Sequence, residues 1–126
     1  MSLEIIESTF EDIEESVDLI VEWTSEINEA GHFTNGTQGM MKLDAVAMRL
    51  QVIGELLKNV NKRDKEFLIK YPGVEWAEAM KLRDIISHHY SELNADIIFK
   101  ICKNDIPQLK KVVVDILNDL KKLLNS

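Results

Sequence analysis

The stretch LDAVAMRLQVIGELLKNV (residues 43–60) decides the fold of this 126-residue chain, because apolar residues recur in it at steps of three and four. That spacing places them on one face of an α-helix, with charged residues on the other faces. We expect a long helix from about residue 41 towards residue 70. Gly54 lies within the apolar stripe, where a glycine costs about 1 kcal/mol relative to alanine, so we expect another helix to pack closely against it. The stripe consists of Leu43, Val46, Ala47, Leu50, Ile53, Gly54, Leu57 and Val60.

A second apolar stripe precedes this one and predicts a helix over residues 8–30. Ser8 and Thr9, each followed three residues later by an acid, are typical of a helix N-terminus. Gly31 is typical of a helix C-terminus, and GHFTNGTQG (residues 31–39) predicts a loop. The stripe consists of Phe10, Ile13, Val17, Ile20, Trp23 and Ile27.

Three further helices are expected after a break at YPG (residues 71–73). The first begins near residue 75, and a short one begins at Asn94. The last begins near Asp105, with Pro107 in its first turn, and continues almost to the end. No segment has the period-two pattern of a strand. The sequence therefore predicts one all-α domain over residues 1–126, an up-and-down bundle of four main helices plus a short helix.

Composition narrows the class of protein. The chain has no run of 18 apolar residues, which predicts no membrane span, and no signal-like N-terminus. Cys102 is the only cysteine, so an intrachain disulfide is impossible, and we expect a cytoplasmic protein. The net charge of −7 argues against a general nucleic-acid binder, which usually carries an excess of basic residues.

The charge is unevenly distributed along the chain. Residues 1–41 contain ten acids and no Lys or Arg, whereas residues 42–126 contain the other twelve acids and all fifteen bases, a net charge of +3. The first part could attract a basic partner and the second could approach an anion. The simpler interpretation of the acidic part is a solvated helix face.

RDIISHHY (residues 83–90) carries the chemically useful side chains. On a helical wheel Leu82, Ile85 and Ile86 fall on one side, which predicts that these three are buried. Metal binding is not expected, because the adjacent histidines of this stretch point apart and no HExxH motif is present. The chain also lacks a glycine-rich nucleotide motif.

Asp84 and His88 share a helix face at the i, i+4 spacing, so the carboxylate could orient the imidazole and raise its pKa. Arg83 and His88 are about 140° apart around the helix. They can act on one group only if the helix ends or bends near Ser87, or if a second copy of the chain contributes. Taken alone, Arg83 and His88 are more often surface residues than catalytic ones, and His89 fits an interior or helix-end residue.

The order Arg, four residues, His, one residue, Tyr in RDIISHHY resembles the HepT-like branch of the HEPN superfamily, the toxins of HEPN/MNT toxin–antitoxin pairs. Three other stretches resemble the same family in the same order, so that the resemblance spans residues 43–120. They are RLQVIGELLKNV (residues 49–60), YPGVEWAEAMKLRD (residues 71–84) and NDIPQLKKVVVDIL (residues 104–117).

This resemblance implies a HEPN-like helical bundle that forms a homodimer through the helix of residues 83–90. It implies a metal-independent endoribonuclease without a cofactor, in which Arg83 contacts the phosphate and His88 is the general acid/base. Asp84 would support or orient this pair. Tyr90 would be the acceptor of AMP, or would position the substrate, and an MNT-type nucleotidyltransferase would be the antitoxin.

Two functions stay open from the sequence. One is the RNase toxin, with an RNA path along basic residues of the second half. The other is a non-catalytic HEPN module that binds a nucleotidyltransferase partner or a nucleotide, which the net charge of −7 and Asp84 favour. The basic residues are Lys58, Lys62, Arg63, Lys65, Lys70 and Lys81.

Overall fold

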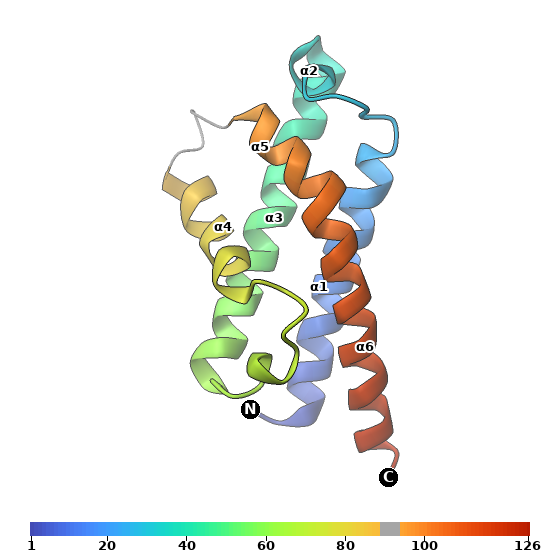
Figure 1. Cartoon of the computed structure of the whole chain (residues 1–126), viewed down its shortest axis with the longest axis vertical. Helices are drawn as coiled ribbons and strands as arrows, with labels where there is room; N and C mark the ends of the chain where they lie inside the picture. Colours follow the sequence, from blue (N-terminus) through green and yellow to red (C-terminus); the bar gives the residue numbers. More distant parts are fainter. Residues whose placement is uncertain (89–93) are drawn as a thin grey trace.

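Four long helices run alternately up and down in the computed structural model, which describes residues 1–88 and 94–126 (Figure 1). Short pieces connect them, and the described residues contain no strand. The predicted all-α bundle of four main helices plus a short helix is confirmed. The long helices are α1 (Leu3–Thr24), α3 (Thr37–Arg63), α4 (Trp76–His88) and α6 (Ile106–Leu124). The short pieces are α2 (Gly31–Thr34), the 3₁₀ turn η1 (Leu68–Lys70), α5 (Ala95–Lys100) and the π-helical turn η3 (Ile101–Asp105).

The start of α1 differs from the prediction. Ser2, not Ser8 or Thr9, is the N-cap, and its Oγ accepts a hydrogen bond from the backbone N–H of Ile5 at 3.2 Å. Both of the predicted caps lie inside the helix, because starting at Leu3 lets Ile6 join the buried stripe.

The end of α1 also differs, since the helix stops at Thr24 rather than near residue 30. The buried Thr24 hydroxyl donates to the carbonyl of Ile20 at 2.7 Å, and Lys103 Nζ donates to the carbonyl of Thr24 at 2.7 Å. A lysine that is distant in the sequence therefore donates a hydrogen bond to a carbonyl that has no partner within the helix.

The predicted loop at residues 31–39 contains a helical turn instead. Gly31–Thr34 form α2 because this buries Phe33 completely. Gly36 then adopts φ of 105°, a left-handed conformation that favours glycine, and α3 begins at the next residue. At its other end α3 stops at Arg63, seven residues short of the predicted end, because the chain turns there to bury Phe67 near Phe10, with ring centroids 5.7 Å apart.

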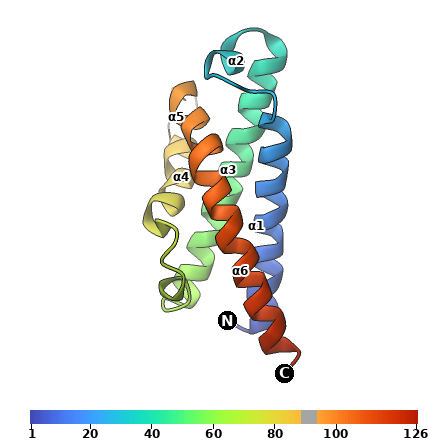
Figure 2. The same ribbon diagram turned by 45° about the vertical axis from the view of Figure 1, so that its right-hand side comes forward.

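The core lies between α1, α3 and α6, which lie side by side in both views (Figures 1 and 2). The predicted stripes of α1 and α3 supply much of this core, together with the apolar face of α6. Within the described part of the chain, no helix is both long and apolar enough to cross a membrane. The side chains with no exposed surface include Phe10, Ile13, Val17, Ile20, Val46, Ala47, Leu50, Ile53, Leu57 and Val60.

The second half of the bundle contains one continuous rod rather than two separate helices. Asn94 caps α5 as predicted, with its Oδ1 accepting from the N–H groups of Asp96 and Ile97 at 2.8 and 3.3 Å. Instead of breaking before α6, the chain passes through η3, and Pro107 lies in the first turn of α6. This rod packs on α1, whereas α4 packs chiefly on α3 at the outside of the bundle (Figure 2).

Candidate active site

The helices α3 and α4 approach each other closely at Gly54. A Cβ atom on Gly54 would lie 2.8 Å from the backbone nitrogen of Arg83 and 2.9 Å from its Cβ. It would also lie 3.3 Å from the carbonyl oxygen of Ala79. The close packing predicted for Gly54 is therefore confirmed, and it places the backbone of Arg83 directly on α3.

Four charged side chains surround this crossing, and we call them the α3–α4 charge cluster: Glu55, Lys58, Arg83 and Asp84. Arg83 Nε donates to Glu55 Oε2 at 2.8 Å, and its Nη1 lies 3.4 Å from Asp84 Oδ1. Lys58 Nζ lies 3.1 and 3.0 Å from the two oxygens of Asp84. Two acids and two bases leave the cluster without net charge.

The protonation states within the cluster follow from these contacts. The hydrogen bond and the charge of Glu55, with a smaller contribution from Asp84, raise the pKa of Arg83 above its ordinary value. The hydrogen bond from Lys58, and then its charge, lower the pKa of Asp84. All four side chains are partly exposed, so the cluster presents fixed charges to the solvent at neutral pH.

The predicted site residues are placed only in part. Arg83 and Asp84 lie together, and the carboxylate of Asp84 is held by Lys58 from α3. His88 is the last described residue of α4, but its side chain, like all of Tyr90, lies outside the described residues. The contact between Asp84 and His88, and the roles of His88 and Tyr90, stay predictions.

Glu55 is the member of the cluster that sequence reasoning missed, and Lys58 was considered only for an RNA path. Arg83 lies 28 residues from Glu55 in the chain, and Lys58 lies 26 residues from Asp84. No local pattern pairs residues so far apart. The available signal was the position of Glu55 directly after Gly54, on the helix edge where a close neighbour was expected.

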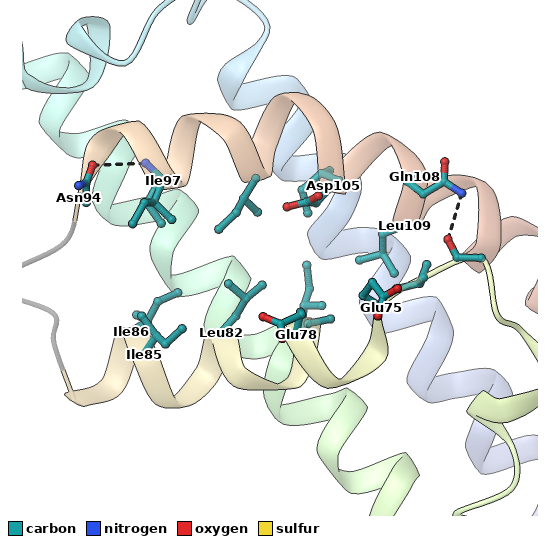
Figure 3. Close-up of a pocket in the computed structure, with 17 residues that line it drawn as sticks. Glu75, Glu78, Leu82, Ile85, Ile86, Asn94, Ile97, Asp105, Gln108 and Leu109 are labelled. Atoms are coloured by element: carbon teal, nitrogen blue, oxygen red, sulfur yellow. Dashed lines mark hydrogen bonds between the residues drawn. The ribbon is translucent and has the colours of Figure 1, made fainter.

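A groove of about 550 Å³ separates α4 from the rod formed by α5, η3 and α6 (Figure 3). Ile85 and Ile97 line it and are 50% and 56% exposed. The prediction that Ile85 is buried is therefore wrong. Ile86 is buried in the core at 1% exposed, and Leu82 packs against the core but is only half-buried, while the adjacent flank of α4 faces the groove.

Cys102 does not contribute a nucleophile. The side chain is buried in η3, and this burial raises the pKa of the thiol to about 12. The thiol is thus protonated at neutral pH, and the residue packs as a small hydrophobic side chain.

Residues 6–116, a span that includes residues 83–90, match the family described as ribonuclease HepT-like. The chain belongs to this family, which confirms the resemblance to the HepT-like branch of the HEPN superfamily. No solved structure matches the chain.

Relatives in archaea agree with this assignment. A Methanocaldococcus jannaschii protein named "Gamma-glutamylcyclotransferase and putative RNase MJ0434" is 34% identical over 112 residues, and the match covers 89% of this chain but 47% of that protein. "Putative RNase MJ1380" of the same organism is 34% identical, with 90% of this chain and 97% of the relative covered. "Probable ribonuclease HepT" of Thermococcus cleftensis is 34% identical over 79% of this chain and 84% of its own length. The chain thus spans about half of the first relative and most of the other two.

Proposed function

We propose that this protein is a metal-independent endoribonuclease, the toxin of a HEPN/MNT toxin–antitoxin pair, acting on RNA in the cytoplasm. The observation that carries the proposal is its membership of the ribonuclease HepT-like family, with residues 83–90 inside the matched region. The names of the relatives, which describe RNases, support the same class of reaction.

The proposed chemistry uses Arg83 and His88. A neutral imidazole of His88 accepts the proton of a ribose 2′-hydroxyl, whose oxygen then attacks the adjacent phosphorus. The bond to the 5′-oxygen breaks, and that oxygen takes up a proton from an imidazolium. Arg83, always charged, stabilises the negative charge that grows on the phosphoryl oxygens. The products are a 2′,3′-cyclic phosphate and a free 5′-hydroxyl.

A second copy of the chain is part of this proposal. The helix α4 continues without a break from Arg83 to His88. At about 100° per residue, positions 83 and 88 of a regular helix are about 140° apart, so one helix cannot easily direct both residues at one small group. Two α4 helices brought together by a two-fold axis can supply one residue each. The half-exposed Ile85 on α4 and Ile97 on α5 give such a homodimer an apolar surface to bury.

The homodimer predicts that Ile97→Glu weakens self-association at least about tenfold, because a charge replaces an apolar side chain that the partner covers. Sedimentation of both proteins over a range of concentrations measures this. Leu123→Glu is the matched control, since Leu123 is 57% exposed against 56% for Ile97 but lies at the far end of α6. A wild type that sediments as a monomer throughout, or equal effects of both changes, would count against the dimer.

The antitoxin in this proposal is an MNT-type nucleotidyltransferase that transfers AMP to Tyr90. The modification would add bulk and negative charge two residues from His88. Such a charge would compete with an RNA phosphate for the guanidinium of Arg83. The family resemblance supports this step.

The first test is cleavage of a short end-labelled RNA in the presence of a metal chelator, beside the same sequence with 2′-O-methyl riboses. The wild type is expected to cut the RNA, to leave 2′,3′-cyclic phosphate ends, and to leave the methylated strand intact, because the attacking hydroxyl is absent from it. Cutting of both strands would refute the mechanism.

Mass spectrometry shows whether the protein carries AMP. If protein without AMP cuts neither strand, a second candidate function follows. The guanidinium of Arg83 already has two carboxylate neighbours, which favours a non-catalytic module that binds a nucleotidyltransferase. In that case the charge cluster would be a structural seam between α3 and α4.

A further inference from the structure

The guanidinium of Arg83 has one short and one longer contact with a carboxylate. Glu55 Oε2 accepts from Nε at 2.8 Å, whereas the second carboxylate neighbour, Asp84, lies farther away at 3.4 Å from Nη1. A guanidinium is a planar group with five N–H donors, so a short hydrogen bond at Nε fixes the orientation of the plane. These two contacts use two donors, and the same group can still donate to a phosphoryl oxygen.

We propose that Glu55 is a positioning residue for Arg83, one that directs the terminal nitrogens of the guanidinium towards the RNA phosphate. This inference rests on the proposed function, in which Arg83 contacts that phosphate. Glu55 acts through Arg83 and does not touch the reacting atoms.

The close crossing of α3 and α4 beside Glu55 supports this positioning role. Gly54 directly precedes Glu55 and brings the α3 backbone against the backbone nitrogen of Arg83. One turn of α3 therefore contacts Arg83 at two points: Gly54 packs against its backbone, and Glu55 binds its guanidinium. A side chain fixed at two points loses less freedom when it binds a ligand.

Lys58 pairs with Asp84 and so leaves Glu55 as the nearer carboxylate partner of Arg83. Its Nζ contacts both oxygens of Asp84 at 3.0 and 3.1 Å, shorter than the 3.4 Å between Asp84 and Arg83. The cluster therefore divides into two pairs across the helices, Glu55 with Arg83 and Lys58 with Asp84. Because Lys58 neutralises Asp84, the acid following Arg83 repels an incoming phosphate less.

The pair of Glu55 and Arg83 contributes little to folding. The two side chains are 52% and 36% exposed, and exposed ion pairs add little to stability. Removing Glu55 should therefore leave the fold intact but let the guanidinium rotate, which lowers the rate of the chemical step. Misplacing a catalytic group by about 1 Å can cost about 100-fold in rate.

The experiment compares Glu55→Ala and Glu55→Gln with the wild type in cleavage of a short RNA. Glu55→Ala is expected to lower kcat about 10- to 100-fold while KM changes less. The amide oxygen of Glu55→Gln can still accept from Nε, so this variant should recover most of the rate. Asp18→Ala is the matched control, because Asp18 forms an exposed ion pair with Lys110 at 2.7 Å, away from α4, and should change neither parameter.

A second readout does not depend on cleavage. The Nε–H group of Arg83 should give a slowly exchanging signal in nitrogen-15 NMR, assigned by its loss in Arg83→Lys. We expect this signal in the wild type and in Glu55→Gln, and its loss in Glu55→Ala.

The outcomes separate the two proposals. A wild type that does not cut RNA overturns the proposed function, and the NMR signal then decides whether Glu55 fixes the guanidinium. The positioning role is overturned if Glu55→Ala cuts RNA as fast as Asp18→Ala does, or faster than the wild type does. A faster variant would show that Glu55 competes with RNA for Arg83. An Nε–H signal that persists in Glu55→Ala overturns it as well.

Discussion

Replacing His88 with alanine is expected to lower the rate of RNA cleavage by about 100- to 10,000-fold, the usual contribution of a positioned general acid or base. Alanine has no group that can take the proton of the 2′-hydroxyl, so the attacking oxygen stays a poor nucleophile. The change should be measured under single-turnover conditions with saturating protein, so that weaker RNA binding does not contribute. Circular dichroism of the variant and the wild type checks that both have the same helical fold.

The matched control for His88→Ala is His32→Ala. His32 lies in α2, where its Nδ1 accepts from the backbone N–H of Asn28 at 3.0 Å, and no role in cleavage is proposed for it. Both variants should be purified identically, because a contaminating nuclease would then cut equally in both samples. Cleavage by His88→Ala at the rate of His32→Ala would place the chemistry elsewhere.

Gly54→Ala is expected to lower the free energy of unfolding by about 2 kcal/mol. The new Cβ would lie 2.8 Å from the backbone nitrogen of Arg83, and backbone atoms cannot move aside as the end of a flexible side chain can. Overpacking of this kind costs about 3 kcal/mol at the upper end of its usual range, and the better helix propensity of alanine returns about 1 kcal/mol. Urea unfolding followed by circular dichroism measures the difference.

Gly31→Ala is the control for this prediction. The nearest atom to its new Cβ would be a carboxylate oxygen of Glu29 at 3.4 Å, an ordinary contact with an exposed and flexible side chain. The free energy of unfolding should change by no more than about 0.5 kcal/mol. Equal stabilities of the two variants would mean that α4 can move away from α3 at little cost.

The apolar stripes predicted most of the core, because burial on one face of a helix imposes a spacing that needs no knowledge of the partner. The helix ends were less predictable. Ser2, Ser8 and Thr9 could all serve as caps, and only the burial of Ile6 in the folded chain favours Ser2. The helix α2 escaped notice because four residues are too few to show a period, although Phe33 is completely buried.

The candidate site was predictable in its local part only. Arg83 and Asp84 followed from the motif, but their partners Glu55 and Lys58 come from another helix. The helical wheel placed Ile85 on the buried side, yet a wheel does not tell whether a neighbouring helix covers the whole of that side. In this fold the rod of α5 and α6 stands off from α4 and leaves a groove.

The antiparallel course of α1 and α6 has a practical consequence for joining this domain to others. Both chain ends emerge at the same end of the bundle, and α2 and α5 lie at the other (Figure 1). A reporter, a surface tether or another folded unit attached at either terminus would therefore start from the end of the bundle away from α2 and α5. A longer polypeptide that carries this domain would thus leave the end with α2 and α5 uncovered by the fused part.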